Sequence, residues 1–456
     1  MLRLIRPLAL GIALVGTALP GLRAQADGPL PLPEDYLPGL KSILANAVTQ
    51  SPRMIARNAE NAASEGNRIV ARAGQLPNAG GFLGYYPWQR DYRADLPRYA
   101  DVNRVNYNFS INQPLFHWGA LQNATRIGEI QLRMTQSQTA EGYRLLVQEI
   151  RAQYLMLIIR KADLAKSHLG AKVTEENYSV AQTKLEKRVI SDADMFMPTV
   201  NRDQARLSVD RAQEDFENSK AVFARLCGSA PLSDDQIPDA VPDVSAAPVT
   251  SLEPLLRAYT SQKDPDSYAL RNIGDQIEVE KLNYKTISTR LLPTLNFQIG
   301  TSQDQTSYTT NIAAKYRVTS IFTGFMVNWT VFDGLAIRGA KATSLARRHQ
   351  LEQSYKDMSA DLVAQARNQL KLVDFARRDM ELTNRLLTSS VGTLRDKRAD
   401  ATRGLASAAD VSNAEIYNQD LSIKAYAART DYLMKVGDFL STLQQDPALA
   451  NLPAKP

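Results

Sequence analysis

Residues 104–116, RVNYNFSINQPLF, alternate between apolar and polar side chains. Val105, Tyr107, Phe109 and Ile111 are apolar, and the positions between them hold Asn and Ser. Because successive side chains of a β-strand point to opposite faces, this segment predicts a strand with one apolar and one polar face. Such a strand, about 10–12 residues long, matches one tilted crossing of an outer membrane. It is suited to separate lipid from a water-filled lumen.

The N-terminus has the pattern of a secretory signal peptide. Arg3 and Arg6 precede an apolar run at 8–19, and small residues at 24–26 form an Ala-x-Ala cleavage site. We therefore expect residues 1–26 to be a signal peptide. Since no later run reaches the roughly 18–20 apolar residues of a spanning helix, we expect an exported protein without a transmembrane helix.

The composition and motifs argue against several function classes. The formal net charge is +6, part of which comes from the signal peptide, so nucleic acid is not an expected partner. The single cysteine, Cys227, cannot form an intrachain disulfide. The three histidines are scattered, and the sequence contains no HExxH, Walker or GxSxG motif. The sequence predicts a protein that is not an enzyme and has no metal or cofactor.

The chain contains an internal repeat. The segment RVNYNFSINQPLFHWGALQNA corresponds to SIFTGFMVNWTVFDGLAIRGA, and Phe332 follows Phe116 by 216 positions. The same offset relates Phe109 to Phe325 and Asp194 to Asp410. A constant offset over this length predicts two repeats of one structural unit.

Each repeat is expected to contain a helix, two strands and two long helices. The first repeat spans 27–227, with a helix at about 37–73, strands at 75–86 and 104–116, and helices at 119–187 and 192–227. A Pro-rich linker covers 228–254. The second repeat spans 255–443, with a helix at about 252–289, strands at 292–302 and 316–332, and helices at 335–403 and 408–443, before a tail at 444–456.

The long helical segments carry apolar or small residues seven positions apart. The two columns are Ile150, Leu157, Leu164, Ala171, Tyr178 and Leu185, and Ala366, Val373, Met380, Leu387, Leu394 and Ala401. This spacing is typical of helices that wind around neighbours. A second column, formed by Gln153, Arg160, Ser167 and Thr174, is polar. We expect each helix to have packed sides and one face in water.

Four strands cannot close a barrel, and open sheet edges are not tolerated in hydrocarbon. Since the smallest outer-membrane barrels have about eight strands, several copies must contribute strands to one barrel. Three copies would give a barrel of twelve strands. The residues expected to face lipid are Val105, Tyr107, Phe109, Ile111, Leu295, Phe297, Ile299, Phe325 and Val327. The alternative is a periplasmic coiled-coil scaffold protein whose strands form a soluble cap.

These features together resemble the TolC family of outer-membrane efflux and secretion channels. The strand-to-helix junctions INQPLFHWGALQNATR and VNWTVFDGLAIRGAK, and the Leu-Pro-x-Leu segment at 292–295, are similar to the family's motifs. The resemblance implies an α+β membrane protein: a homotrimer with a 12-stranded β-barrel in the outer membrane that continues into a long periplasmic α-helical barrel. It also implies an exit duct of a tripartite efflux pump or type I secretion system. Its partners would be a periplasmic adaptor and an inner-membrane transporter.

The resemblance also places a gate where the long helices break. Gly404, Ser407, Asp410 and Val411 match the family's tip pattern, whereas Arg188 replaces the glycine in the first repeat and predicts a different turn there. The expected gate residues are Asp410, Asp194, Asp396, Arg398, Asp400 and Arg403. The expected adaptor-docking residues are Val189, Ile190, Ser191, Gly404, Leu405, Ala406 and Ser407. Since Asn413 occupies the second acidic position, we expect a ring of Asp410 carboxylates and a weaker cation preference than the family pattern would give. Asp194 and Asp410 as simple helix N-terminal acids remain an alternative.

Overall fold

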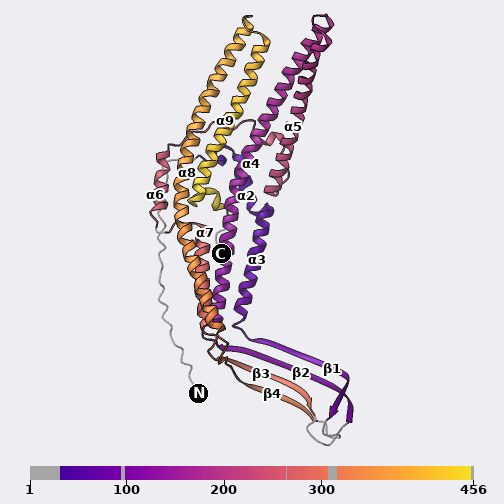
Figure 1. Cartoon of the computed structure of the whole chain (residues 1–456), viewed down its shortest axis with the longest axis vertical. Helices are drawn as coiled ribbons and strands as arrows, with labels where there is room; N and C mark the ends of the chain where they lie inside the picture. The colour runs from indigo at the N-terminus through magenta and orange to yellow at the C-terminus, as the bar shows by residue number, and fades with distance from the viewer. Residues whose placement is uncertain (1–30, 94–97, 263, 307–315, 453–456) are drawn as a thin grey trace, which may run out of the picture.

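The computed structural model of the chain describes residues 31–93, 98–262, 264–306 and 316–452 (Figure 1). Side chains at 89, 91–104 and 304–318 are not described. The predicted signal peptide therefore lies outside the described residues. The molecule is elongated: two long helical hairpins extend from one side of a central helical region, and a four-stranded sheet projects from its other end (Figure 1).

The order of elements follows the two predicted repeats. The first half contains α1 (Pro33–Tyr36), α2 (Pro38–Gln50), α3 (Pro52–Ala73), β1 (Asn78–Arg93), β2 (Arg98–Phe116), α4 (Ala120–Glu186), the 3-10 helix η1 (Asp192–Met195) and α5 (Phe196–Cys227). The linker contains η2 (Asp234–Gln236) and η3 (Val249–Ser251). The second half contains α6 (Glu253–Thr260), α7 (Tyr268–Ser288), β3 (Thr294–Thr306), β4 (Tyr316–Asn328), α8 (Ala336–Thr402), α9 (Ala408–Thr442) and η4 (Pro447–Asn451). Helices α4 and α8 each have 67 residues, which is about 100 Å of helix.

The sheet is antiparallel with strand order β1-β2-β3-β4. Ile111 pairs with Ile299, and Phe297 pairs with Phe325, so these side chains share one face. All nine residues predicted to face lipid lie on this apolar face, because each falls on the same alternation of the register. The opposite, polar face holds Asn108, Ser110, Asn112, Gln298 and Ser302, with three aromatic rings described below.

Several predicted strand bounds are wrong. The first strand begins at Asn78 and continues past its predicted end at residue 86. Pro87 lies where the register between β1 and β2 shifts, and because β1 is an edge strand its missing N–H is tolerated. The fourth strand ends at Asn328, four residues early, because the chain turns through Gly334 and Leu335, both with positive φ, into α8. The second and third strands also run beyond 104–116 and 292–302.

Two predicted helices are interrupted, and a third begins with a 3-10 turn. The helix predicted at 37–73 is broken between α2 and α3, where Ser51 is extended and Pro52 starts the next helix. The Ser51 hydroxyl donates to the carbonyl of Leu226, 2.9 Å away, so the break is held by a distant segment. The helix predicted at 252–289 is divided into α6 and α7. The helix predicted at 192–227 begins with the 3-10 turn η1.

A glycine ends α5 where it meets this break. Gly228 has φ +72°, and a Cβ there would lie 1.9 Å from the carbonyl oxygen of Gln50. Any other residue would therefore displace the backbone between α2 and α3. The contact fixes the end of α5 against the start of the first repeat.

The two apolar cores lie in the central region of the molecule. The first packs α2, α3 and α5 against the middle of α4, around Tyr143, Ile150 and Phe223. The second packs α6 and α9 against α8, around Val373 and Phe439. The hairpins beyond these cores have few buried residues, so the central region holds the molecule together.

A buried ionic cluster joins distant parts of the chain in this region. Arg151 of α4 is fully buried, and its guanidinium donates to Asp446 at 2.5 and 2.8 Å and to Glu34 of α1 at 2.9 Å. Burial alone would lower the pKa of Arg151, but hydrogen bonds to Asp446 and Glu34 outweigh it and keep that pKa above its ordinary range. Arg151 thus connects α4 to the start of the first repeat and to the segment that follows the second.

We expect Arg151→Met to destabilise the fold by about 3–5 kcal/mol, because two buried carboxylates lose their counterion. The control is Arg53→Ala, which breaks the exposed ion pair with Glu149 and should cost less than about 1 kcal/mol. Urea unfolding followed by circular dichroism, at one protein concentration, measures both. Equal effects of the two substitutions would contradict the role of the cluster.

Candidate functional site

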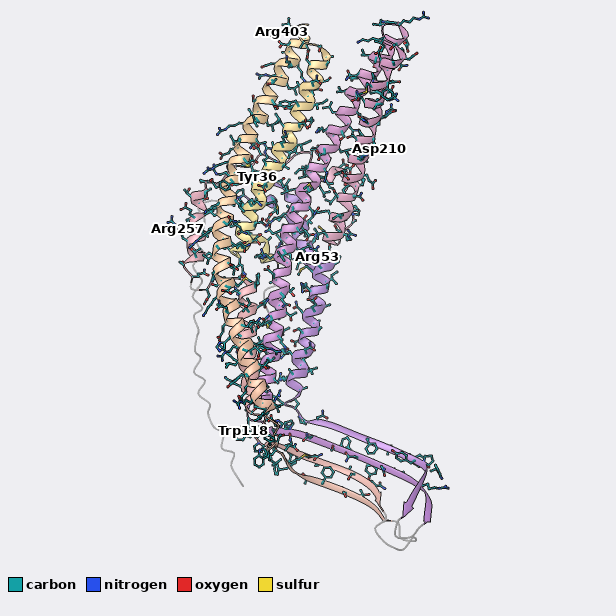
Figure 2. The ribbon with its side chains drawn as sticks, viewed as in Figure 1. Tyr36, Arg53, Trp118, Asp210, Arg257 and Arg403 are labelled. Atoms are coloured by element: carbon teal, nitrogen blue, oxygen red, sulfur yellow. The ribbon has the colours of Figure 1, made fainter. Side chains whose placement is uncertain are left out.

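The ends of the two hairpins form equivalent turns. After α4, the amide of Val189 donates to the carbonyl of Lys184 at 2.8 Å; after α8, that of Leu405 donates to Asp400 at 2.9 Å. Both hairpins end on the side of the molecule away from the sheet, and Figure 2 labels Arg403 there. The long helices therefore carry the two tips to the point most distant from the strands.

The turn predicted to differ in the first repeat does not differ. Arg188 has φ 58° and Gly404 has φ 74°, so both are in the left-handed region. No atom lies within 4 Å of a Cβ built on Gly404, which shows that this turn leaves room for a side chain. The arginine is accepted at an energetic cost, about 1–2 kcal/mol for a residue other than glycine.

The acidic residues at the tips cap the restarting helices. The Asp410 carboxylate accepts from the amide and hydroxyl of Ser407, at 2.9 and 2.7 Å. Asp194 accepts from Ser191 in the same way and at the same distances. Hydrogen bonds from these serines lower the pKa of both aspartates, which stay ionised throughout the neutral range. Both carboxylates are exposed, so capping leaves them accessible from solvent.

The charged residues predicted to hold the gate do not pair with one another in this chain. Arg398 instead forms an ion pair with Glu415 of α9 at 2.6 Å, a partner that the sequence reasoning missed. Asp396 lies 3.7 Å from Arg395. Asp400 accepts backbone hydrogen bonds through its carbonyl, and Arg403 is exposed at the tip. The role of these residues at a gate stays a prediction.

The predicted docking residues lie on the surface of both turns. Val189 and Leu405 are the most prominent, with 69% and 76% of their surface exposed. Phe196 and Met197 are also exposed, and the sequence reasoning missed them. The sequence could have indicated them, because they form an apolar pair just after a helix cap. The equivalent positions of the second repeat hold the polar residues Ser412 and Asn413.

Three of the four residues in the polar column of α4 face a cavity between helices. A hollow of about 420 Å³ lies among α4, α5 and α9, and Arg160, Ser167 and Thr174 line it. Nearby, Lys166 of α4 pairs with Asp420 of α9 at 2.5 Å, which joins the two hairpins. This confirms the prediction that these polar residues are not packed in an apolar core.

The junction between sheet and helices is rich in aromatic residues. The indole N–H of Trp118 donates to the carbonyl of Pro293 at 2.7 Å, and that of Trp329 to Leu291 at 3.0 Å. Figure 2 labels Trp118 at this junction. Both indoles are exposed, with the polar edge bound to the backbone and the ring at the surface. This arrangement suits an apolar–aqueous boundary.

Among the described residues, none of the helices has the length and apolar character needed to cross a membrane. No group of three or more His, Cys, Asp or Glu side chains in the same ranges is arranged to hold a metal ion.

Comparison with solved structures identifies the class of fold. The chain matches the Campylobacter jejuni CmeC outer membrane channel with a TM-score of 0.67 and 11% identity, covering 93% of this chain and 90% of that one. It matches the outer-membrane channel OprN (TM-score 0.64, 14% identity, 90% and 91% covered) and the outer membrane protein VceC from Vibrio cholerae (0.61, 14%, 89% and 97%). Neither a protein-family model nor a curated protein matches the sequence.

The chain therefore has the fold of an outer-membrane channel subunit. The resemblance to the TolC family is thus confirmed for the fold of the single chain, which is mostly helical with an antiparallel sheet of four strands. At such low identity the likeness concerns the fold alone, and residue roles rest on the geometry described above.

Exchanging Arg188 and Gly404 tests the strain in the first turn. We expect Arg188→Gly to slow hydrogen exchange of the Val189 amide about threefold, because glycine adopts the left-handed conformation without the steric cost of a side chain. The matched variant Gly404→Arg should speed exchange of the Leu405 amide by a similar factor. Hydrogen exchange followed by mass spectrometry resolves the two tips. If neither amide changed its exchange rate, the conclusion that the two turns have the same conformation but different strain would be contradicted.

Proposed function

We propose that this protein is the outer-membrane exit duct of an export system and assembles as a homotrimer with a 12-stranded barrel. The single observation that carries the proposal is the sheet. Among the described strands, β1 pairs only with β2, and β4 only with β3, so two edges need partners. Three copies arranged in a ring would pair every edge and close the barrel.

The apolar face supports a barrel wall in lipid. On it, Phe325 and Val327 are 70% and 61% exposed in the single chain, which is unusual for a soluble sheet. The 13 residues of β4 span about 43 Å, enough to cross an apolar band of about 25 Å at the usual tilt. In a soluble periplasmic scaffold protein, this exposed apolar face would have no lipid to contact.

The helical part supports a conduit through the periplasm. Helices of about 100 Å lead away from the sheet and end in capped turns with exposed aliphatic residues. We infer that the duct conducts passively and that an inner-membrane transporter supplies the energy. A periplasmic adaptor would dock at Val189, Ile190 and Ser191 and at the second tip. The system would be a tripartite efflux pump or a type I secretion system, located in the outer membrane of a Gram-negative bacterium.

The state of the purified protein tests the assembly. We expect the protein in the outer-membrane fraction, as a trimer that resists SDS and dissociates on heating, because strands of neighbouring copies are joined by a continuous hydrogen-bond ladder. Gel electrophoresis with and without heating, and light scattering in detergent, measure this. A monomer that stays soluble without detergent would refute the duct.

The gate role of Asp410 can be separated from its capping role. Asp410→Asn removes the charge but keeps an oxygen that can accept from Ser407, whereas Ser407→Ala removes the hydroxyl and keeps the charge. We expect the first variant to lower the cation-to-anion permeability ratio about twofold, because three carboxylates would ring the entrance, and the second to leave it unchanged.

Reversal potentials of the trimer in planar bilayers measure this ratio. An unchanged ratio in Asp410→Asn would remove Asp410 from the gate. Equal loss in both variants would assign Asp410 to capping alone.

A further inference from the structure

The polar face of the sheet carries no charged side chain over most of its area. Segments 78–88, 105–116, 294–303 and 319–328 contain no Asp, Glu, Lys or Arg. The register places Asn108 beside Ser302, and Ser110 beside Gly300, so amides, hydroxyls and glycines cover the middle of this face. Such a surface offers no site for a metal cation or a polyanion.

Three aromatic rings interrupt this surface, and each lies against a glycine. A Cβ built on Gly300 would meet the ring of Phe322 at 2.7 Å. One built on Gly84 would meet the rings of Tyr86 at 3.2 Å and Phe82 at 3.3 Å. The rings thus occupy the space that a side chain would fill, and glycine lets them lie close to the backbone.

The rings remain accessible from the polar side. Phe82 and Tyr86 keep 56% and 48% of their surface exposed, and Phe322 is half-buried. They belong to β1 and β4, the two edge strands. In a closed ring of copies, β4 of one chain would pair with β1 of the next and bring these rings into one seam.

We propose that these rings form a binding site for planar aromatic cargo on the inner wall of the barrel, with Phe82 and Tyr86 from one copy and Phe322 from its neighbour. This inference rests on the proposed duct, since it requires the polar face to line the lumen. A planar ring gains from stacking on an aromatic face without needing charge on the wall. Amides such as Asn108 and Gln298 are suited to hydrogen-bond the cargo's polar edges.

Binding of an acridine dye to the purified trimer tests the site. Fluorescence anisotropy is measured in detergent at high ionic strength, which screens exposed carboxylates, with empty micelles as the blank. The ring variant combines Phe82→Leu, Tyr86→Leu and Phe322→Leu. We expect it to bind the dye at least about tenfold more weakly, because leucine keeps apolar volume but cannot stack.

The control variant carries the same change on the other face. It combines Phe109→Leu, Phe297→Leu and Phe325→Leu; Phe109 also leans over a glycine, since a Cβ on Gly81 would meet its ring at 3.1 Å. We expect its dye affinity to stay within about twofold of the original protein, because this face is covered by detergent.

Each outcome decides the proposal. If the trimer is intact but the ring variant binds as the original protein does, or if both variants lose affinity equally, the site is refuted while the duct stands. If a neutral oligosaccharide binds the same rings as tightly as the dye, aromatic cargo is the wrong class. A monomeric original protein would overturn the duct and this site together.

Discussion

Backbone hydrogen bonding at the two open edges of the sheet is the constraint on which this molecule depends. β1 and β4 each have one partner among the described strands, and the apolar face beside them is exposed in the single chain. In water an edge strand can be satisfied by solvent, but in hydrocarbon it cannot. The amphipathic strands and their unpaired edges are therefore the reason why we propose a closed cylinder shared between copies.

The long helices α4 and α8 extend from the sheet to the tips, a distance that no single contact spans. Beyond the central cores, α4 and α8 continue for many turns with mostly surface contacts. Their direction is set in the central region, where Arg151 binds Glu34 and Asp446 from opposite ends of the chain. A buried ionic cluster stabilises less than an apolar core of equal volume, but it is specific about which segments it joins. The ionic cluster around Arg151 is therefore suited to a region that sets the direction of two hairpins.

The two repeats show how one backbone accommodates different chemistry. Both turns use the same hydrogen bonds and the same serine–aspartate caps, although Arg188 replaces the glycine found at 404. The differences lie in what each tip exposes: Phe196 and Met197 follow the first cap, and Ser412 and Asn413 follow the second. The backbone of the two turns is thus alike while the surfaces that they expose differ, which allows two unlike contacts in one chain.

The sequence alone determined the features that depend on neighbouring residues. The alternation of apolar and polar residues correctly assigned all nine predicted residues to one face of the sheet. The ends of α4 and α8 lie within one residue of their predicted positions. Both predictions succeed because periodicity and helix caps depend on residues close together in the sequence. Tertiary structure alone decided the break at Ser51, which Leu226 holds, and the pairing of Arg151 with Asp446. It also decided that Arg398 pairs with Glu415 and that the ring of Phe322 lies against Gly300. Such contacts join residues distant in the chain, and no spacing in the sequence specifies them.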